Sequence, residues 1–115
     1  MRYLIFICGD DSLELTPEEG AAMGRDTAAW VEEMTARGIR IDGHRLEPAA
    51  DATTVRVRSS EVLVSDGPYA ETKEQIGGFD LLECADLDEA IEVASKHPVA
   101  RIGTIEVRPF WPDPW

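Results

Sequence analysis

The stretch Arg2-Tyr3-Leu4-Ile5-Phe6-Ile7-Cys8 decides the fold. It is short and rich in isoleucine and aromatic residues, which is typical of a central β-strand. Alternate residues of a strand face opposite sides of a sheet, so both faces of this strand are apolar. Helices on one side of a single sheet would leave the other face in water. In a chain of 115 residues, a partner subunit is the natural cover for that second face.

The first helix is predicted from Thr16-Pro17-Glu18-Glu19 to about Arg37, ending at Gly38. A hydroxyl N-cap, a proline at the first helical position and a carboxylate three residues after the cap form a strong start signal. One face of this helix carries an apolar stripe that predicts packing in the core: Met23, Thr27, Trp30, Val31 and Met34.

A second helix is predicted where Asp86-Leu87-Asp88-Glu89 repeats the capping pattern, and Pro98 closes it. The buried stripe of this helix is expected to consist of Leu87, Ala90, Ile91 and Ala94. His97 falls in the last turn, where the partial negative charge of a helix end favours a cation, so capping is enough to explain it.

The remaining strands are predicted at 39–46, 54–58, 61–65, 78–84 and 104–109. The order is then strand, helix, strand, inserted β-hairpin, strand, helix, strand, a split βαβ arrangement. We therefore expect an α+β fold with an antiparallel sheet and two helices on one face, in a single domain over residues 1–115. The aromatic tail, residues 110–115, is expected to pack along its own subunit or across a dimer.

The charge balance excludes several classes of function. The chain has 11 basic and 23 acidic residues and a net charge of −12, which argues against nucleic acid and anionic membrane surfaces as partners. No apolar run is long enough to span a bilayer, and no signal peptide is recognisable, so we expect a soluble cytoplasmic protein. Cys8 and Cys84 lie in apolar segments and are expected to be reduced and buried.

No sequence motif indicates a metal or cofactor. The chain has no phosphate-binding glycine loop, no His-Glu-x-x-His, no Cys-x-x-Cys pair and no serine nucleophile elbow. We therefore expect chemistry that needs neither a cofactor nor a metal ion.

The run from Asp66 to Phe79 is the predicted working loop, because it places a phenol, carboxylates, a hydroxyl, an ammonium and an amide in one short segment. Asp66 and Glu71 are catalytic candidates, and Tyr69 and Lys73 are ligand-binding candidates. Asp66 could equally bond the backbone of its own turn. Glu71 would serve as a proton shuttle in an apolar cleft and would be an ordinary surface acid in water.

Three further candidates lie on predicted strands. His44 shares a strand face with Asp42, so the pair could act as a base and its orienting group, or His44 could simply face solvent. Arg108 shares a face with Glu106, either as an ordinary surface pair or lining a cleft between subunits. Arg56 would add positive charge there if the hairpin folds over that face.

The segment Asp66-Gly67-Pro68-Tyr69 resembles the Asp-Gly-Pro-Phe signature of the YCII-related proteins, the DGPF family, with Tyr69 in place of phenylalanine. The resemblance extends over nearly the whole chain, except residues 110–115. It implies a ferredoxin-like fold whose sheets pair in homodimers to form an α+β barrel.

Two functional hypotheses follow from this resemblance. The first is a dimer that binds or transforms a small organic metabolite by proton transfer in a cofactor-independent cleft, since related barrels include isomerases and monooxygenases. The second is a regulatory module that binds a protein partner, because genes of this family are found beside extracytoplasmic-type sigma factors. The acidic charge would suit a partner with a basic surface.

Overall fold

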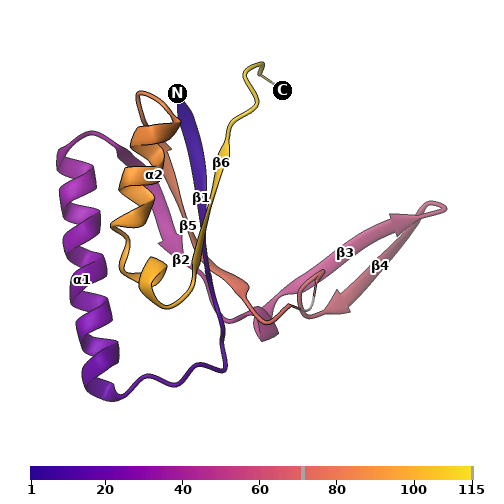
Figure 1. Ribbon diagram of the computed structural model, residues 1–115. Helices are drawn as coiled ribbons and strands as arrows, with labels where there is room; N and C mark the ends of the chain where they lie inside the picture. The colour runs from indigo at the N-terminus through magenta and orange to yellow at the C-terminus, as the bar shows by residue number, and fades with distance from the viewer. Residues whose placement is uncertain (71, 115) are drawn as a thin grey trace.

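The computed structural model describes residues 1–70 and 72–114 and shows the expected α+β fold (Figure 1). A four-stranded antiparallel sheet has the order β2-β5-β1-β6, which is the ferredoxin-like order. The central strand β1 pairs with β5 and β6 along almost its whole length. The sheet strands are β1 (Arg2–Gly9), β2 (Arg40–Arg45), β5 (Gln75–Glu83) and β6 (Thr104–Pro109).

One face of the sheet is covered by α1 (Pro17–Ala36) and α2 (Leu87–Ser95). The core between them contains Tyr3 and Ile5 of β1 with Leu82 of β5, each at most 2% exposed. The predicted start of α1 is confirmed: the Thr16 hydroxyl accepts the Glu19 N–H at 3.1 Å, and the Glu19 carboxylate accepts the Thr16 N–H at 3.0 Å. This reciprocal capping fixes where the chain turns into the helix.

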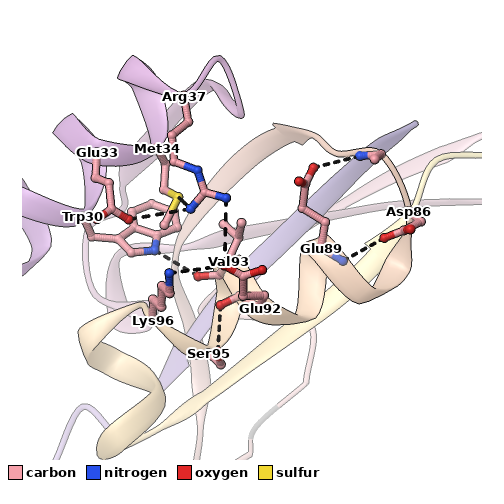
Figure 2. A network of polar contacts seen from close by, with 11 residues as sticks. Trp30, Glu33, Met34, Arg37, Asp86, Glu89, Glu92, Val93, Ser95 and Lys96 are labelled. Carbon is pink, nitrogen blue, oxygen red and sulfur yellow. Dashed lines mark hydrogen bonds and ion pairs between the residues drawn. The ribbon is translucent and has the colours of Figure 1, made fainter.

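The two helices are joined at their ends by polar contacts (Figure 2). The buried indole N–H of Trp30 donates to the Val93 carbonyl oxygen at 3.0 Å. Around it, Glu92 pairs with Arg37 at 3.9 Å and with Lys96 at 3.2 Å. The exposed ion pairs add little to stability, whereas the buried Trp30 bond joins the two helices inside the core that Met34, Ala90 and Val93 also form.

The predicted buried stripe of α2 was partly wrong. Leu87 is 50% exposed and Ile91 is 51% exposed, whereas Ala90, Val93 and Ala94 are buried. Both sets have helical spacing, so periodicity alone does not separate them. The side of α2 that faces the core is the one with Ala90 and Val93, which belong to the same buried cluster as Trp30.

The opposite face of the sheet has no cover among the described residues. In the centre of this open face, Leu4 pairs with Leu81 and Phe6 with Phe79. All four side chains are only half-buried. The prediction that β1 has two apolar faces is thus confirmed, and the uncovered set is the one containing Leu4 and Phe6.

The hairpin forms a separate two-stranded sheet that projects away from the body (Figure 1). We call β3 (Thr53–Arg58) and β4 (Glu61–Asp66) the arm. In the arm Val55 pairs with Val64 and Val57 with Val62, so one of its faces consists of four valines, each 56–64% exposed. The radius of gyration is 16.1 Å, above the about 13 Å of a compact chain of this length.

The C-terminal tail leaves the sheet after one backbone bond, from the Phe110 N–H to the Arg2 carbonyl oxygen at 3.0 Å. Trp111 is 81% exposed, so it does not pack on its own subunit. Of the two predicted positions for the tail, packing across a dimer stays a prediction. In the described part of the chain, no helix has the length and apolar character needed to cross a membrane.

Candidate functional site

A cavity of about 540 Å³ lies between the first half of α1 and the sheet. Its wall also includes the segment after β1 and the short 3-10 helix η2 (Pro98–Arg101). A cavity of this size suits a small organic molecule. We call it the α1 cavity.

The inner face of α1 changes character along its length. Trp30 and Met34 in the second half are buried in the core. Nearer its start, Gly20, Gly24 and Thr27 line the α1 cavity. The predicted apolar stripe is therefore core at one end of the helix and cavity wall at the other, because small residues leave room there.

Replacing Gly24 with alanine is expected to raise the free energy of unfolding by about 1 kcal/mol, because glycine is that much worse than alanine inside a helix. A Cβ atom at Gly24 would meet no atom within 4 Å, so no clash offsets the gain. Urea unfolding measures the change, and Gly20→Ala, with the same open surroundings, should give a gain of similar size. A loss of stability in both variants would contradict an open wall at this part of α1.

Asp80 of β5 lies in the wall of the α1 cavity and is 5% exposed. Its Oδ1 atom accepts the Arg40 Nε–H at 2.7 Å. Burial raises the pKa of the Asp80 carboxyl, while the Arg40 bond and charge oppose that rise. The Asp80 carboxylate is therefore paired with the Arg40 charge, and its pKa lies above that of a carboxyl group in water.

Gly43 of β2 has no side chain, and the Asp80–Arg40 pair occupies the space where a side chain would lie. A Cβ atom at Gly43 would overlap Asp80 Oδ1 and lie 2.7 Å from both the Arg40 guanidinium and the Phe79 carbonyl oxygen. No side chain can therefore be added there while the pair keeps its place.

We expect Gly43→Ala to lower the free energy of unfolding by about 3 kcal/mol, since the methyl group forces the Asp80–Arg40 pair apart or displaces β2. Thermal unfolding followed by circular dichroism gives the measurement. Gly77→Ala on β5 is the control, because its Cβ would lie at an ordinary 3.8 Å from the nearest atom. Equal stability of the two variants would show that the pair tolerates displacement.

His97 also lines the α1 cavity and is 4% exposed. It was predicted to be a cationic helix cap, and this was wrong: burial lowers the pKa of His97 to about 4, so the ring is neutral. Its Nδ1 atom accepts the Val99 N–H at 3.1 Å, and its ring meets the Trp30 ring edge-on with centroids 4.7 Å apart. The residue caps η2 instead of α2.

Two polar atoms open onto the α1 cavity. Neither His97 Nε2 nor Asp80 Oδ2 has a hydrogen-bond partner within residues 1–70 and 72–114. In that same part of the chain, no fully buried side-chain nitrogen or oxygen lacks a partner. Both atoms must therefore reach open space, and the space beside them is the cavity that both residues line.

The predicted strand candidates differ in their relation to the α1 cavity, because His44 is in its lining, whereas Arg56 and Arg108 are not. By register, His44 lies opposite Phe79 and Asp42 opposite Leu81, so both share the open face of the sheet, as predicted. They do not contact each other: His44 Nδ1 donates to the Arg45 carbonyl oxygen at 2.5 Å, and Asp42 accepts the Gly43 N–H at 2.8 Å. Their proposed joint role stays a prediction.

Arg108 lies on the opposite edge of the open face. Its guanidinium is 5.3 Å from the centre of the Phe6 ring and pairs with Glu106. The arm projects away from the sheet and does not fold over β6 in the single chain (Figure 1). Arg56 instead stacks on Tyr69, with its guanidinium carbon 5.2 Å from the centre of the Tyr69 ring.

The working loop borders a second cavity of about 540 Å³, formed with residues 46–52 and containing Tyr69 in its wall. Asp66 is exposed, and the bonds in its turn are made by Gly67, whose N–H donates to the Ala52 carbonyl oxygen at 2.7 Å. Hydrogen bonds from Ser12 hold the pKa of Asp10 below its usual range, and the nearby Lys73 ammonium adds to this. Glu71 lies outside the described residues. The ligand and catalytic roles of these loop residues stay predictions.

The cavity residues Arg40 and Asp80 were not candidates on the sequence alone, and His97 was explained as a helix cap. One signal was present, since Asp80 shares a strand face with buried Leu82, and a charged residue on a buried face is rare unless paired. Among the described residues, no group of three or more His, Cys, Asp or Glu could hold a metal ion. The polar atoms of the cavity are therefore best considered as hydrogen-bonding and proton-accepting groups.

Comparison with known proteins places nearly the whole chain in one family. The family model for the YCII-related domain matches residues 1–113. An uncharacterized protein of Rhizobium meliloti (strain 1021) is 38% identical over 114 residues, which cover 96% of this chain and 92% of that protein.

Proposed function

We propose that this chain, which belongs to the YCII-related family, binds a small organic metabolite in the α1 cavity and moves a proton on it without a cofactor. The observation that carries the proposal is that two buried residues, Asp80 and His97, each present a polar atom, Oδ2 and Nε2, to the same cavity. Buried groups with shifted pKa values in a cavity are typical of functional sites.

The two groups have complementary chemistry. Asp80 is a carboxylate whose pKa is raised by burial, which makes it a better proton acceptor near neutral pH. His97 stays neutral, so it stabilises charge on a ligand by hydrogen bonding. Proton transfer on a bound molecule requires a base, here Asp80, and is assisted by a hydrogen-bond donor, here His97.

The purified protein should be screened against a metabolite library by thermal shift, together with Asp80→Asn and the cavity-filling variant Gly24→Leu. A ligand of the α1 cavity raises the melting temperature of the parent and loses this effect in Gly24→Leu. Asp66→Asn and Arg108→Gln serve as matched variants outside that interior, because neither residue lines the α1 cavity. A hit that is lost only in those two, or a parent that responds to nothing, contradicts the proposal.

The protein is further proposed to be a homodimer in which the open sheet face of one subunit covers that of the other. Members of the family are commonly dimeric. The apolar centre of the face, with Phe6 and Phe79 half-buried, supports this arrangement because such a surface is costly to leave in water.

For the dimer, Phe6→Glu is expected to shift the molar mass in solution from two chains to one, because it places a charge at the centre of the open face. Light scattering coupled to gel filtration makes the measurement. Leu87→Glu on α2 is the control, since Leu87 is exposed on the helix side, away from the open face, and should leave the mass unchanged. A parent protein that runs as one chain at all concentrations would contradict the homodimer.

A regulatory role with a protein partner is the second candidate, favoured by the exposed valine face of the arm. Its test is co-expression with an extracytoplasmic-type sigma factor from the same genome, followed by co-purification. The complex should be lost in a variant with Val57→Asp and Val62→Asp. Failure of the parent to co-purify contradicts this role.

A further inference from the structure

The donor and acceptor arrangement of the α1 cavity restricts what it can bind, and this inference rests on the proposed function. We infer that the ligand is an uncharged carbonyl compound with an apolar body. Its carbonyl oxygen accepts the His97 Nε2–H, and a C–H bond next to the carbonyl faces Asp80 Oδ2. The reaction class is then enolisation, leading to isomerisation of the carbonyl compound.

His97 can only donate into the cavity. The Val99 N–H is a donor, so Nδ1 of the neutral ring must hold the lone pair that accepts it. The single ring proton then sits on Nε2, the atom that opens onto the cavity. A carbonyl oxygen satisfies this donor, whereas an ammonium group or a hydrocarbon does not.

The interior is unfavourable for a carboxylate ligand. The one guanidinium deep in the wall, Arg40, already pairs with Asp80. The Asp80 charge would repel a second carboxylate, and Asp10 and Asp11 add negative charge to the wall. Arg45 and Lys73 provide opposing charge near the rim. The rest of the wall is largely aliphatic, with side chains such as Ile7, Leu13, Leu15, Met23, Val99 and Ile102.

The proposed step balances without an oxidant or reductant. Asp80 takes the proton from the carbon next to the carbonyl, and the C–H electron pair forms a carbon–carbon double bond. The carbonyl π pair moves to oxygen, where the His97 Nε2–H stabilises the enolate. Return of the proton from Asp80 to the same carbon gives exchange, and its return to a conjugated carbon gives the isomer.

Two substitutions separate the roles of the His97 ring. His97→Asn keeps an acceptor for the Val99 N–H, because asparagine is a favoured cap, but it lacks the Nε2 donor. His97→Gln keeps a donor near the position of Nε2 but loses the close acceptor. If His97 serves only to cap η2, the glutamine variant should lose more of the ligand preference than the asparagine variant. If the Nε2–H binds the ligand, the asparagine variant should lose more of it.

Three probes with one skeleton test the ligand class: 2-acetylnaphthalene, 2-ethylnaphthalene and 2-naphthoate, titrated by NMR. We expect the ketone to bind about fivefold more tightly than the hydrocarbon, as one neutral hydrogen bond allows, and the carboxylate to bind most weakly. The preference for the ketone should persist in His97→Gln and vanish in His97→Asn. In D₂O, the parent should exchange the acetyl protons for deuterium, and Asp80→Asn should not.

Each outcome has a defined meaning. Tightest binding by the carboxylate, or equal binding of ketone and hydrocarbon to the parent, overturns this inference and leaves the cavity as a binding site. Absence of exchange by the parent with bound ketone overturns the assigned step. Failure of all three probes to bind contradicts the proposed function itself.

Discussion

Replacing His97 with asparagine will remove most of the acid sensitivity of the fold between pH 6.5 and pH 4. The folded pKa of His97 is about 4, against an ordinary value of 6.5. Between these values the unfolded chain binds a proton that the folded chain does not, so the free energy of unfolding decreases as the pH falls. The shift corresponds to about 3 kcal/mol, present in full above pH 6.5 and lost by about pH 4.

Urea unfolding of the parent and of His97→Asn at pH 7, pH 5 and pH 4 tests this. The parent should lose stability steeply over the range, and the variant should lose much less. His44→Asn is the control, since His44 is exposed and bonded only to a neighbouring carbonyl, and it should follow the parent. Parallel losses in the parent and His97→Asn would show that His97 can be protonated in the folded state.

Arg40→Met is expected to lower the free energy of unfolding by about 3–5 kcal/mol at pH 7, because it leaves the buried Asp80 carboxylate without its partner. Burial already raises the pKa of Asp80, and loss of the guanidinium raises it further. A carboxyl with a raised folded pKa favours the folded state more as the pH falls. The deficit of Arg40→Met should therefore shrink under acid conditions, once Asp80 is protonated.

Adding Asp80→Asn to Arg40→Met should restore much of the lost stability at pH 7, because no buried charge remains. Arg108→Met is the matched control, since its partner Glu106 is about half exposed, and it should leave stability nearly unchanged. An Arg40→Met deficit that is the same at every pH would contradict the assignment of the cost to Asp80.

Local signals in the sequence determined most of the elements. The capping pattern at Thr16 and Glu19 and the positive φ of 73° at Gly38 mark the ends of α1 because each depends on neighbouring residues alone. The two apolar faces of β1 were likewise readable from alternation. These features need no knowledge of what the rest of the chain does.

The candidate site could not be predicted to the same extent, because it depends on contacts between distant segments. Asp80 becomes a buried group only because Arg40, forty residues away in sequence, pairs with it. His97 becomes neutral only because the Trp30 ring and η2 surround it. The glycines of α1 leave room beside the helix, but this room becomes a cavity only because the sheet lies opposite, and the sequence does not show that arrangement.

The arm and the main sheet differ in when they can form. The arm closes between neighbouring segments, with Arg58 paired to Glu61, so it can form as soon as residues 53–66 have been synthesised. The central strand β1 must wait for β5 and β6, whose last paired residue is Pro109. The apolar strand β1 thus stays unpaired until β5 has been synthesised, and its pairing is completed only when β6 follows.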